Sequence, residues 1–194
     1  MKVKENYYFT QPEIRKIDFE EKRVILVTAH RRENFGEPLR NICFALKEII
    51  DSFPDVEIVY PVHPNPNIQK PVKRLLGEVG RIHLLEPLGY DSLVNLMNQC
   101  YLMLTDSGGI QEEAPSLGKP VLVLRAVTER PEAVTAGTVK VIGTEKENIV
   151  RETKILLENK EEYQRMARAI NPYGDGKAAE RIIEILLNYK KDLD

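Results

Sequence analysis

Residues 101–113 read YLMLTDSGGIQEE, a short apolar run that passes through a pair of glycines into a polar segment. The apolar run is typical of a buried strand over 101–104, and the residues from Gly108 onward predict a helix over 108–117. A strand that turns directly into a helix is the repeating unit of α/β folds, so this stretch indicates the fold class.

The same alternation of apolar runs and helical stripes extends through the chain on both sides of this stretch. The apolar runs predict six strands, at 24–27, 56–60, 82–85, 101–104, 121–124 and 139–142. Helices are predicted at 39–50, 72–77, 93–100, 108–117, 129–136 and from 146 onward, with a break at 171–174. Because the strands are almost continuous in apolar residues, we expect a buried parallel sheet with helices on both faces. We also expect a linker-like lead-in over residues 1–21 and one domain over 22–194.

The composition narrows the class of protein. With 194 residues, of which 42% are hydrophobic, the chain has enough apolar material for a folded core. The net charge of −2 argues against nucleic acid as a partner, because nucleic-acid-binding proteins present a basic face. No apolar run approaches the roughly 18–20 residues that cross a membrane, so no membrane partner is expected. Cys43 and Cys100 lie far apart without metal-binding spacing, which favours buried thiols in a reducing cytoplasm.

Unusual polar clusters follow several of the predicted strands. Residues 30–33 follow the first strand, His63 follows the second, residues 106–109 follow the fourth and residues 125–132 follow the fifth. The carboxyl ends of parallel strands lie on one edge of a sheet, where α/β proteins bind their ligands. The clusters therefore predict a ligand site at this edge.

The turn after the strand at 101–104 has the features of a phosphate-binding turn. Gly108 and Gly109 let the backbone approach a ligand closely, and Ser107 adds a hydroxyl donor. The free N–H groups and the positive end of the helix that follows also suit phosphate. One turn into that helix, the carboxylate of Glu113 is suited to accept hydrogen bonds from ribose hydroxyls. The alternative is an ordinary N-cap at a glycine turn, and the neighbouring clusters favour the functional interpretation.

Basic side chains and histidines in the other clusters suit a diphosphate. Arg31 and Arg32 carry the positive charge that such a group requires, and His30 can move a proton near neutral pH. Arg130 is flanked by acidic residues and could also reach the diphosphate. The alternatives are a solvated basic loop for the first cluster, a surface salt-bridge cluster around Arg130 and a packed turn histidine for His63.

Other classes of site are disfavoured. Residues 174–179 match G-x-G-x-x-A, but they follow a predicted helix rather than a strand, so they do not fit a dinucleotide-binding turn. The sequence contains no P-loop motif. No metal site is expected, because the three histidines, His30, His63 and His83, are scattered.

Five motifs, taken in order, resemble those of a known family. They are TAHRREN at 28–34, PVHPNP at 61–66, LTDSGGIQEEAP at 104–115, TERPE at 128–132 and NPYGDG at 171–176. Together they resemble the C-terminal half of the non-hydrolysing bacterial UDP-N-acetylglucosamine 2-epimerases, over about residues 22–190.

The resemblance implies both a fold and a reaction. The fold is a Rossmann-like domain of the kind that forms the C-terminal half of a GT-B arrangement. The reaction is the interconversion of UDP-GlcNAc and UDP-ManNAc, which makes the family isomerases. UDP is eliminated across C1–C2 of the sugar and is added back after reprotonation on the other face. Neither a metal nor a nicotinamide cofactor takes part.

The motif match also implies roles for individual residues. Ser107, Gly108 and Gly109 would bind the diphosphate together with Arg130. Glu113 would bind the ribose hydroxyls, and His30 would sit at the reacting centre. Further candidates are Arg31 and His63, and Leu88 and Leu93 for contact with the uracil.

Two departures from the family bear on activity. The pair Ala126-Val127 replaces a usual Asp-Thr, which removes polar groups beside the diphosphate site. The family is also about twice as long, and its N-terminal domain supplies the carboxylates that handle the C2 proton. We therefore expect a UDP-binding half that is inactive without an N-terminal half, whether it is a shortened chain or the product of a split gene. A homodimer is one candidate assembly.

Two alternative functions stay open. A UDP-sugar hydrolase or a GT-B glycosyltransferase would share this kind of domain, and fold alone does not settle chemistry. The clusters at 30–33 and 128–132 favour the epimerase, whereas free ManNAc and UDP as products would favour the hydrolase. The chain could instead be a non-enzymatic nucleotide-binding or docking module, and an exposed apolar face would then indicate docking or self-association.

Overall fold

The computed structural model describes residues 3, 7–174 and 176–191, and its centre is a six-stranded sheet. The strands are β1 (Arg23–Thr28), β2 (Val56–Pro61), β3 (Ile82–Leu85), β4 (Leu102–Thr105), β5 (Val121–Val123) and β6 (Val139–Val141). Their order is β3-β2-β1-β4-β5-β6, and every pairing is parallel. The predicted strands and the α/β, Rossmann-like fold class are confirmed.

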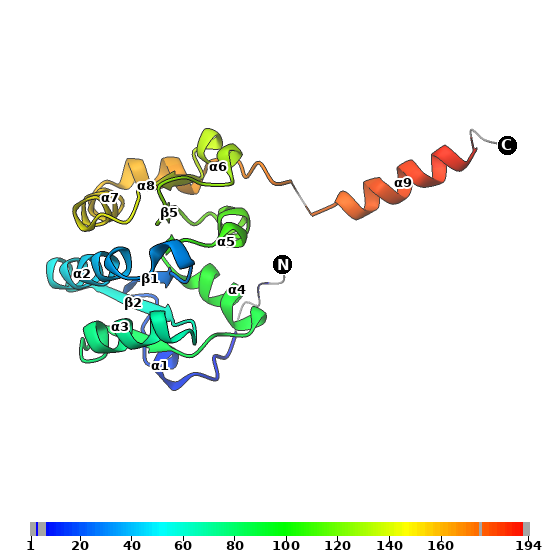
Figure 1. The fold of residues 1–194 in the computed structure, drawn as a ribbon. Coiled ribbons are helices and arrows are strands. Elements are labelled where there is room, and N and C mark those ends of the chain that lie inside the picture. The colour runs from blue at the N-terminus through cyan, green and yellow to red at the C-terminus, as the bar shows by residue number, and fades with distance from the viewer. Residues whose placement is uncertain (1–2, 4–6, 175, 192–194) are drawn as a thin grey trace.

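Helices follow the strands along the chain and cover both faces of the sheet (Figure 1). The α-helices are α1 (Pro12–Arg15), α2 (Glu37–Ser52), α3 (Pro66–Leu76), α4 (Tyr90–Gln99), α5 (Gly108–Glu113), α6 (Pro131–Ala136), α7 (Lys146–Glu158), α8 (Lys160–Ala167) and α9 (Ala178–Lys191). Two short 3-10 helices are η1 (Arg32–Asn34) and η2 (Ala114–Leu117).

Two of the differences between the predicted and the observed helices have a clear local cause. Helix α3 begins at Pro66 rather than at 72, because the side chain of Asn65 caps it by accepting a hydrogen bond from the Asn67 N–H. Proline is favoured in the first turn, where its missing N–H costs nothing. The helix predicted over 108–117 divides into α5 and η2 just before Pro115, whose ring cannot supply a hydrogen bond to a continuing α-helix.

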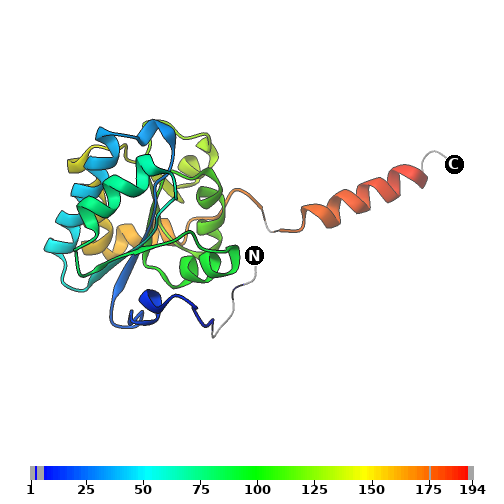
Figure 2. The same cartoon turned by 60° about the horizontal axis from the view of Figure 1, so that its bottom comes forward.

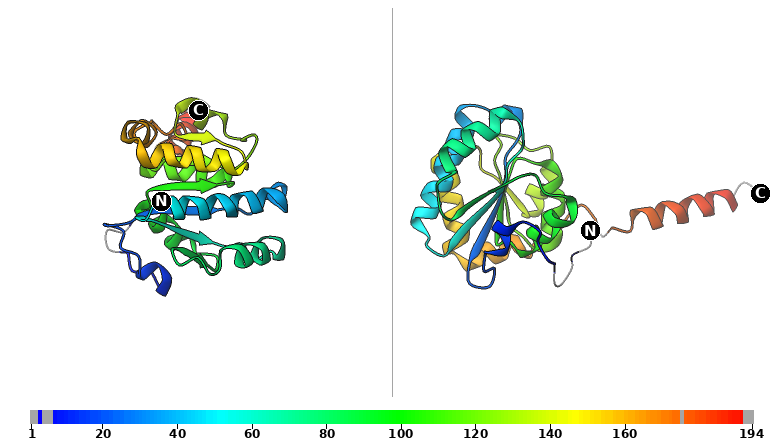
Figure 3. Two further views of the ribbon diagram at one scale, coloured as in Figure 1. Left: turned by 90° about the vertical axis from the view of Figure 1, so that its left-hand side faces the viewer. Right: turned by 90° about the horizontal axis from the view of Figure 1, so that it is seen from below.

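The sheet separates two hydrophobic cores. Along β1, Ile25 and Val27 pack into the core beneath α2, α3 and α7, whereas Val24 and Leu26 pack into the core beneath α4 and α5. Figure 1 and the right view of Figure 3 show these helix layers on opposite sides of the strands. Because successive side chains of a strand point to opposite faces, a strand buried on both sides must be apolar throughout.

The lead-in contributes to the second core. Phe9, Ile14 and Ile17 are buried there, and the Tyr7 hydroxyl lies 2.7 Å from the Ser92 hydroxyl on α4. These apolar side chains are spaced among charged residues, so the segment looked polar in the sequence. Of the lead-in predicted at 1–21, residues 1–2 and 4–6 lie outside the described part of the chain.

Helix α9 stands away from the rest of the molecule (Figures 1 and 2). Its large apolar side chains are exposed: Ile182, Ile183, Ile185, Leu186, Leu187 and Tyr189. Even so, within residues 3, 7–174 and 176–191 no helix has the length and apolar character needed to cross a membrane. The predicted break before α9 is present, although Asp175 within it lies outside the described residues.

Both cysteines are buried, and their reactivity tests the two cores. Burial raises the pKa of the Cys43 thiol and of the Cys100 thiol to about 12. Because the thiolate is the reactive form, we expect neither cysteine to react with Ellman's reagent near neutral pH while the chain is folded. Both should react in denaturant. A rapid reaction of the native protein would contradict the burial of these side chains.

Candidate functional site

The site lies where the strand order changes direction. Strands β1 and β4 are neighbours, and the hydroxyls of their last residues, Thr28 and Thr105, form a hydrogen bond of 2.6 Å. The chain continues from β1 toward β2 on one side and from β4 toward β5 on the other. The two loops that leave these strands therefore diverge and leave a crevice, which is where open α/β sheets bind ligands.

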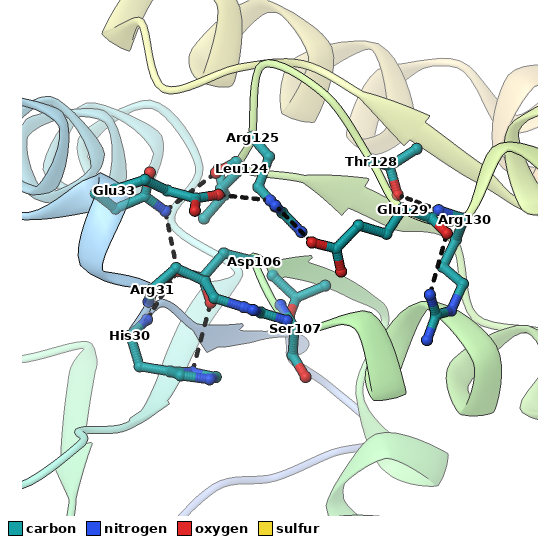
Figure 4. A network of polar contacts seen from close by, with 12 residues as sticks. His30, Arg31, Glu33, Asp106, Ser107, Leu124, Arg125, Thr128, Glu129 and Arg130 are labelled. Atoms are coloured by element: carbon teal, nitrogen blue, oxygen red, sulfur yellow. Dashed lines mark hydrogen bonds and ion pairs between the residues drawn. The ribbon is translucent and has the colours of Figure 1, made fainter.

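A buried carboxylate joins the two loops (Figure 4). Asp106 directly follows β4 and is fully buried. Its Oδ2 accepts hydrogen bonds from the backbone N–H groups of His30 and Arg31, both at 2.8 Å, and from Asn34 Nδ2 at 2.9 Å. Three donors on one oxygen compensate a buried charge for its lost hydration, and they hold the loop after β1 against the end of β4.

The two predicted histidines of the site lie side by side. The His30 and His63 rings stack with centroids 5.7 Å apart and planes 17° apart. His30 Nδ1 lies 3.4 Å from Asp106 Oδ1, and His63 Nδ1 accepts a hydrogen bond from the Asn65 N–H at 3.1 Å. His63 thus has the contact of a turn histidine, but its side chain is exposed rather than packed, and it lines the same cavity as His30.

The guanidinium groups of Arg31 and Arg130 both lie close to Gly108. A Cβ placed on Gly108 would stand 3.7 Å from Arg130 Nη2 and 3.9 Å from Arg31 Nη2. Arg130 also pairs through Nε with Glu112, and this hydrogen bond raises the pKa of the guanidinium. Within the described residues, Arg31 Nε is buried without a hydrogen-bond partner. Two guanidinium groups around a residue with no side chain suit an anion with several oxygens.

Thr128 links the second of these arginines to α5. Its hydroxyl donates to Gln111 Oε1 at 2.5 Å and accepts from the Arg130 N–H at 3.0 Å. Nearby, Arg125 Nε donates to Glu33 Oε1 at 2.6 Å, which ties this loop to the one after β1 (Figure 4). The polar clusters at 30–33, 106–109 and 125–132 are therefore brought together as predicted.

An open cavity of about 310 Å³ lies beside the two cations. Its lining is Thr28, His30, Pro61, His63, Pro87, Leu88, Tyr90, Leu93, Ser107, Gly109, Ile110 and Glu113. Most of the predicted site residues are in this set, whereas Gly108, Arg31 and Arg130 stand next to it. The lining combines apolar side chains with a few polar and titratable groups, which suits a ligand with an aromatic base and a charged part.

Sequence reasoning missed Tyr90 and the central position of Asp106. Tyr90 is the first residue of α4. Burial raises the pKa of Glu113, and a hydrogen bond with Tyr90 opposes part of that shift. The sequence signal for Tyr90 is an aromatic residue immediately after Pro87, Leu88 and Gly89 at a strand–helix junction. For Asp106 the sequence places the residue at a strand end, but it cannot show that the side chain turns inward.

The described residues contain no group of three or more histidines, cysteines or carboxylates able to hold a metal ion. Ala126 and Val127 are both exposed, Val127 with 73% of its surface accessible. The altered pair at 126–127 therefore lies on the surface of the loop rather than against α5.

A comparison with known families matches residues 2–187 to the model of the UDP-N-acetylglucosamine 2-epimerase family. The chain belongs to this family. It is 58% identical over 171 residues to the UDP-N-acetylglucosamine 2-epimerase of Campylobacter jejuni, an alignment that covers 88% of this chain and 45% of that protein. This chain spans about half the length of the curated relatives that it matches.

Solved structures of this epimerase family share its fold. A Listeria monocytogenes member is 48% identical, with a TM-score of 0.90 over 99% of this chain and 50% of its own. The Neisseria meningitidis UDP-GlcNAc 2-epimerase, solved bound to UDP-GlcNAc, is 50% identical, with a TM-score of 0.87 over 91% of this chain and 47% of its own. Both are about twice as long as this chain.

Proposed function

We propose that this chain is the UDP-binding C-terminal half of an enzyme that interconverts UDP-GlcNAc and UDP-ManNAc by eliminating UDP and adding it back. The observation that carries this proposal is that the guanidinium groups of Arg31 and Arg130 both lie close to Gly108, beside a cavity whose lining includes Leu88 and Leu93. Membership of the epimerase family supports it, as does the binding of UDP-GlcNAc by the N. meningitidis relative.

The proposed placement of the ligand follows the polarity of the site. The diphosphate binds between the two arginines, against Ser107, Gly108 and Gly109. The ribose hydroxyls donate to Glu113, and the uracil lies against Leu88 and Leu93. This order places the sugar near His30, with His63 behind it.

In this placement the charges of the site favour bond cleavage. As the C1–O bond of the sugar breaks, the departing diphosphate gains negative charge. Two fixed guanidinium groups stabilise that charge without having to reorganise. The Ser107 hydroxyl caps no N–H of α5 within the described structure, and its O–H can donate to the same anion.

The proposal also includes a second half. The C2 proton needs carboxylates on the other side of the sugar, which an N-terminal half supplies. The exposed apolar side chains of α9 suit a surface that this half covers. The L. monocytogenes member matches 99% of this chain within a chain about twice as long, which supports the same position for α9 in a complete protein. We place this enzyme in the cytoplasm, where unpaired cysteines stay reduced.

A single methyl group tests the diphosphate site. In Gly108→Ala the new Cβ would lie 3.7 Å from Arg130 Nη2 and 3.9 Å from Arg31 Nη2, where the proposal places an oxygen of the diphosphate. We expect UDP affinity, measured by calorimetric titration, to fall at least about tenfold, whereas thermal stability stays equal or rises because alanine restricts the unfolded chain.

Gly80→Ala is the matched control, because a Cβ there would meet no described atom within 4 Å. It should bind UDP as the unsubstituted chain does. If the unsubstituted chain gives neither heat nor thermal stabilisation with UDP, the proposed binding site is wrong for this half alone. If Gly108→Ala and Gly80→Ala bind UDP with equal affinity, the diphosphate does not lie against Gly108.

A further inference from the structure

One carboxylate oxygen of Asp106 has no hydrogen-bond partner among the described residues. Asp106 Oδ2 accepts three hydrogen bonds, but Oδ1 is buried and has no hydrogen-bond partner among the described residues. A buried acceptor without a donor is destabilising, and more so when it carries charge. A nitrogen able to donate to it is His30 Nδ1, at 3.4 Å.

The distance is slightly longer than the hydrogen-bond range of about 2.7–3.2 Å. Hydrogen bonds at reacting centres are often long in the unliganded state and shorten when the ligand binds. The backbone N–H of His30 already donates to Oδ2 of the same carboxylate. This hydrogen bond keeps the His30 ring close to the other carboxylate oxygen, Oδ1. A small rotation of the ring is enough to close the remaining contact.

We propose that Asp106 is a positioning residue that holds neutral His30 as the Nδ1–H tautomer, with Oδ1 accepting that proton. The ring nitrogen on the opposite side, Nε2, then carries a lone pair and is the one that exchanges protons with a ligand. When Nε2 is protonated, the imidazolium donates one N–H to Asp106 and the other to an oxygen of the anion. Only this last step rests on the proposed function, because it needs the diphosphate in the cavity.

The other two histidines have contacts that select the opposite tautomer. His83 Nε2 lies 2.6 Å from Glu57 Oε2, a carboxylate that requires a donor at Nε2. His63 Nδ1 accepts from the Asn65 N–H, so its proton must also sit on Nε2. These are all the histidines in the sequence. The structure therefore predicts one Nδ1–H histidine and two Nε2–H histidines in the same chain.

Asp106→Asn changes one contact and preserves the others. Because three N–H donors surround the Oδ2 position, the asparagine oxygen must take that place and its NH2 group must face His30 Nδ1. An NH2 group only donates, so Nδ1 becomes an acceptor and the proton moves to Nε2. The same exchange of a carboxylate for an amide reverses the histidine tautomer in serine proteases.

The test is a long-range ¹H–¹⁵N correlation spectrum of the chain labelled at histidine, recorded at alkaline pH where the rings are neutral. Single His63→Asn and His83→Asn variants assign the signals. We expect the protonated nitrogen of His30 to be Nδ1, and those of His63 and His83 to be Nε2. In Asp106→Asn the two His30 nitrogens should exchange their types, and the other histidines should be unchanged.

Asn34→Ala is the control, because it removes one donor from Oδ2 and leaves the atom facing His30 unaltered. It should keep the Nδ1–H tautomer of His30. An Nε2–H tautomer of His30 in the unsubstituted chain would overturn the proposal, even if Asp106→Asn did not fold. So would an unchanged His30 pattern in folded Asp106→Asn. The spectrum needs no UDP, so a failure of UDP binding leaves this result readable, and a failure here leaves the UDP titration standing.

Discussion

Arg31→Ala combined with Arg130→Ala is expected to reduce UDP affinity by about a hundredfold to ten-thousandfold. Each charged hydrogen bond contributes about 1.5–3 kcal/mol, and both guanidinium groups lie within 4 Å of a Cβ placed on Gly108. Loss of Arg130 also leaves Glu112 without its cation, which adds a negative charge near the diphosphate. Calorimetric titration with UDP measures the effect, and each single variant should give part of it.

Arg32→Ala is the control for charge alone. Arg32 lies next to Arg31 on the same loop, but its side chain is exposed. Its removal should change UDP affinity by less than about threefold at physiological salt, because exposed charges are screened beyond about 8 Å. Equal losses for Arg31→Ala and Arg32→Ala would indicate a general electrostatic attraction in place of a built site.

The isolated chain is expected to bind UDP but to epimerise UDP-GlcNAc at least about a thousandfold more slowly than a complete family member. Positioning of reacting groups contributes about 7–11 kcal/mol to a barrier, and one half of a cleft provides only part of it. Without the second half, water also reaches the sugar. Formation of UDP-ManNAc measures the activity. Adding the separately expressed N-terminal half of the C. jejuni relative should restore it.

Helix α9 provides a variant that tests this assembly. Leu186→Glu places a charge on its exposed apolar surface, and burial of a leucine is worth about 1.5–3 kcal/mol, so restoration should require about tenfold to a hundredfold more of the N-terminal half. Asn188→Glu adds the same charge on the same helix and should have a smaller effect. UDP binding by the isolated chain should be unchanged in both.

The products of these assays separate the candidate functions. Full epimerase activity of the isolated chain would contradict the need for a second half. Release of free ManNAc with UDP would identify a hydrolase. UDP binding with no sugar product, in the presence of a well-folded N-terminal half, would instead favour a nucleotide-binding or docking module.

Apolar patterning alone was enough to predict the six strands, most of the helices and the edge of the sheet that carries the site. The run at 101–104 and its counterparts are apolar throughout because strands covered on both faces have no side that meets water. Parallel strands bring all of their carboxyl ends to one edge, so the clusters at 30–33 and 106–109 had to lie on the same side of the molecule. Local patterns are sufficient for these conclusions.

Which of those clusters contact one another depends on the order of the strands in the folded sheet. Strand β1 lies between β2 and β4, so Asp106 meets the loop of His30, although 76 residues separate them. Burial of Asp106, inclusion of Tyr90 in the cavity and burial of Phe9 in the second core all depend on the same strand order. The physical reason is that a pattern of apolar and polar residues specifies which face of an element is buried, whereas the choice of neighbour depends on contacts between residues far apart in the chain.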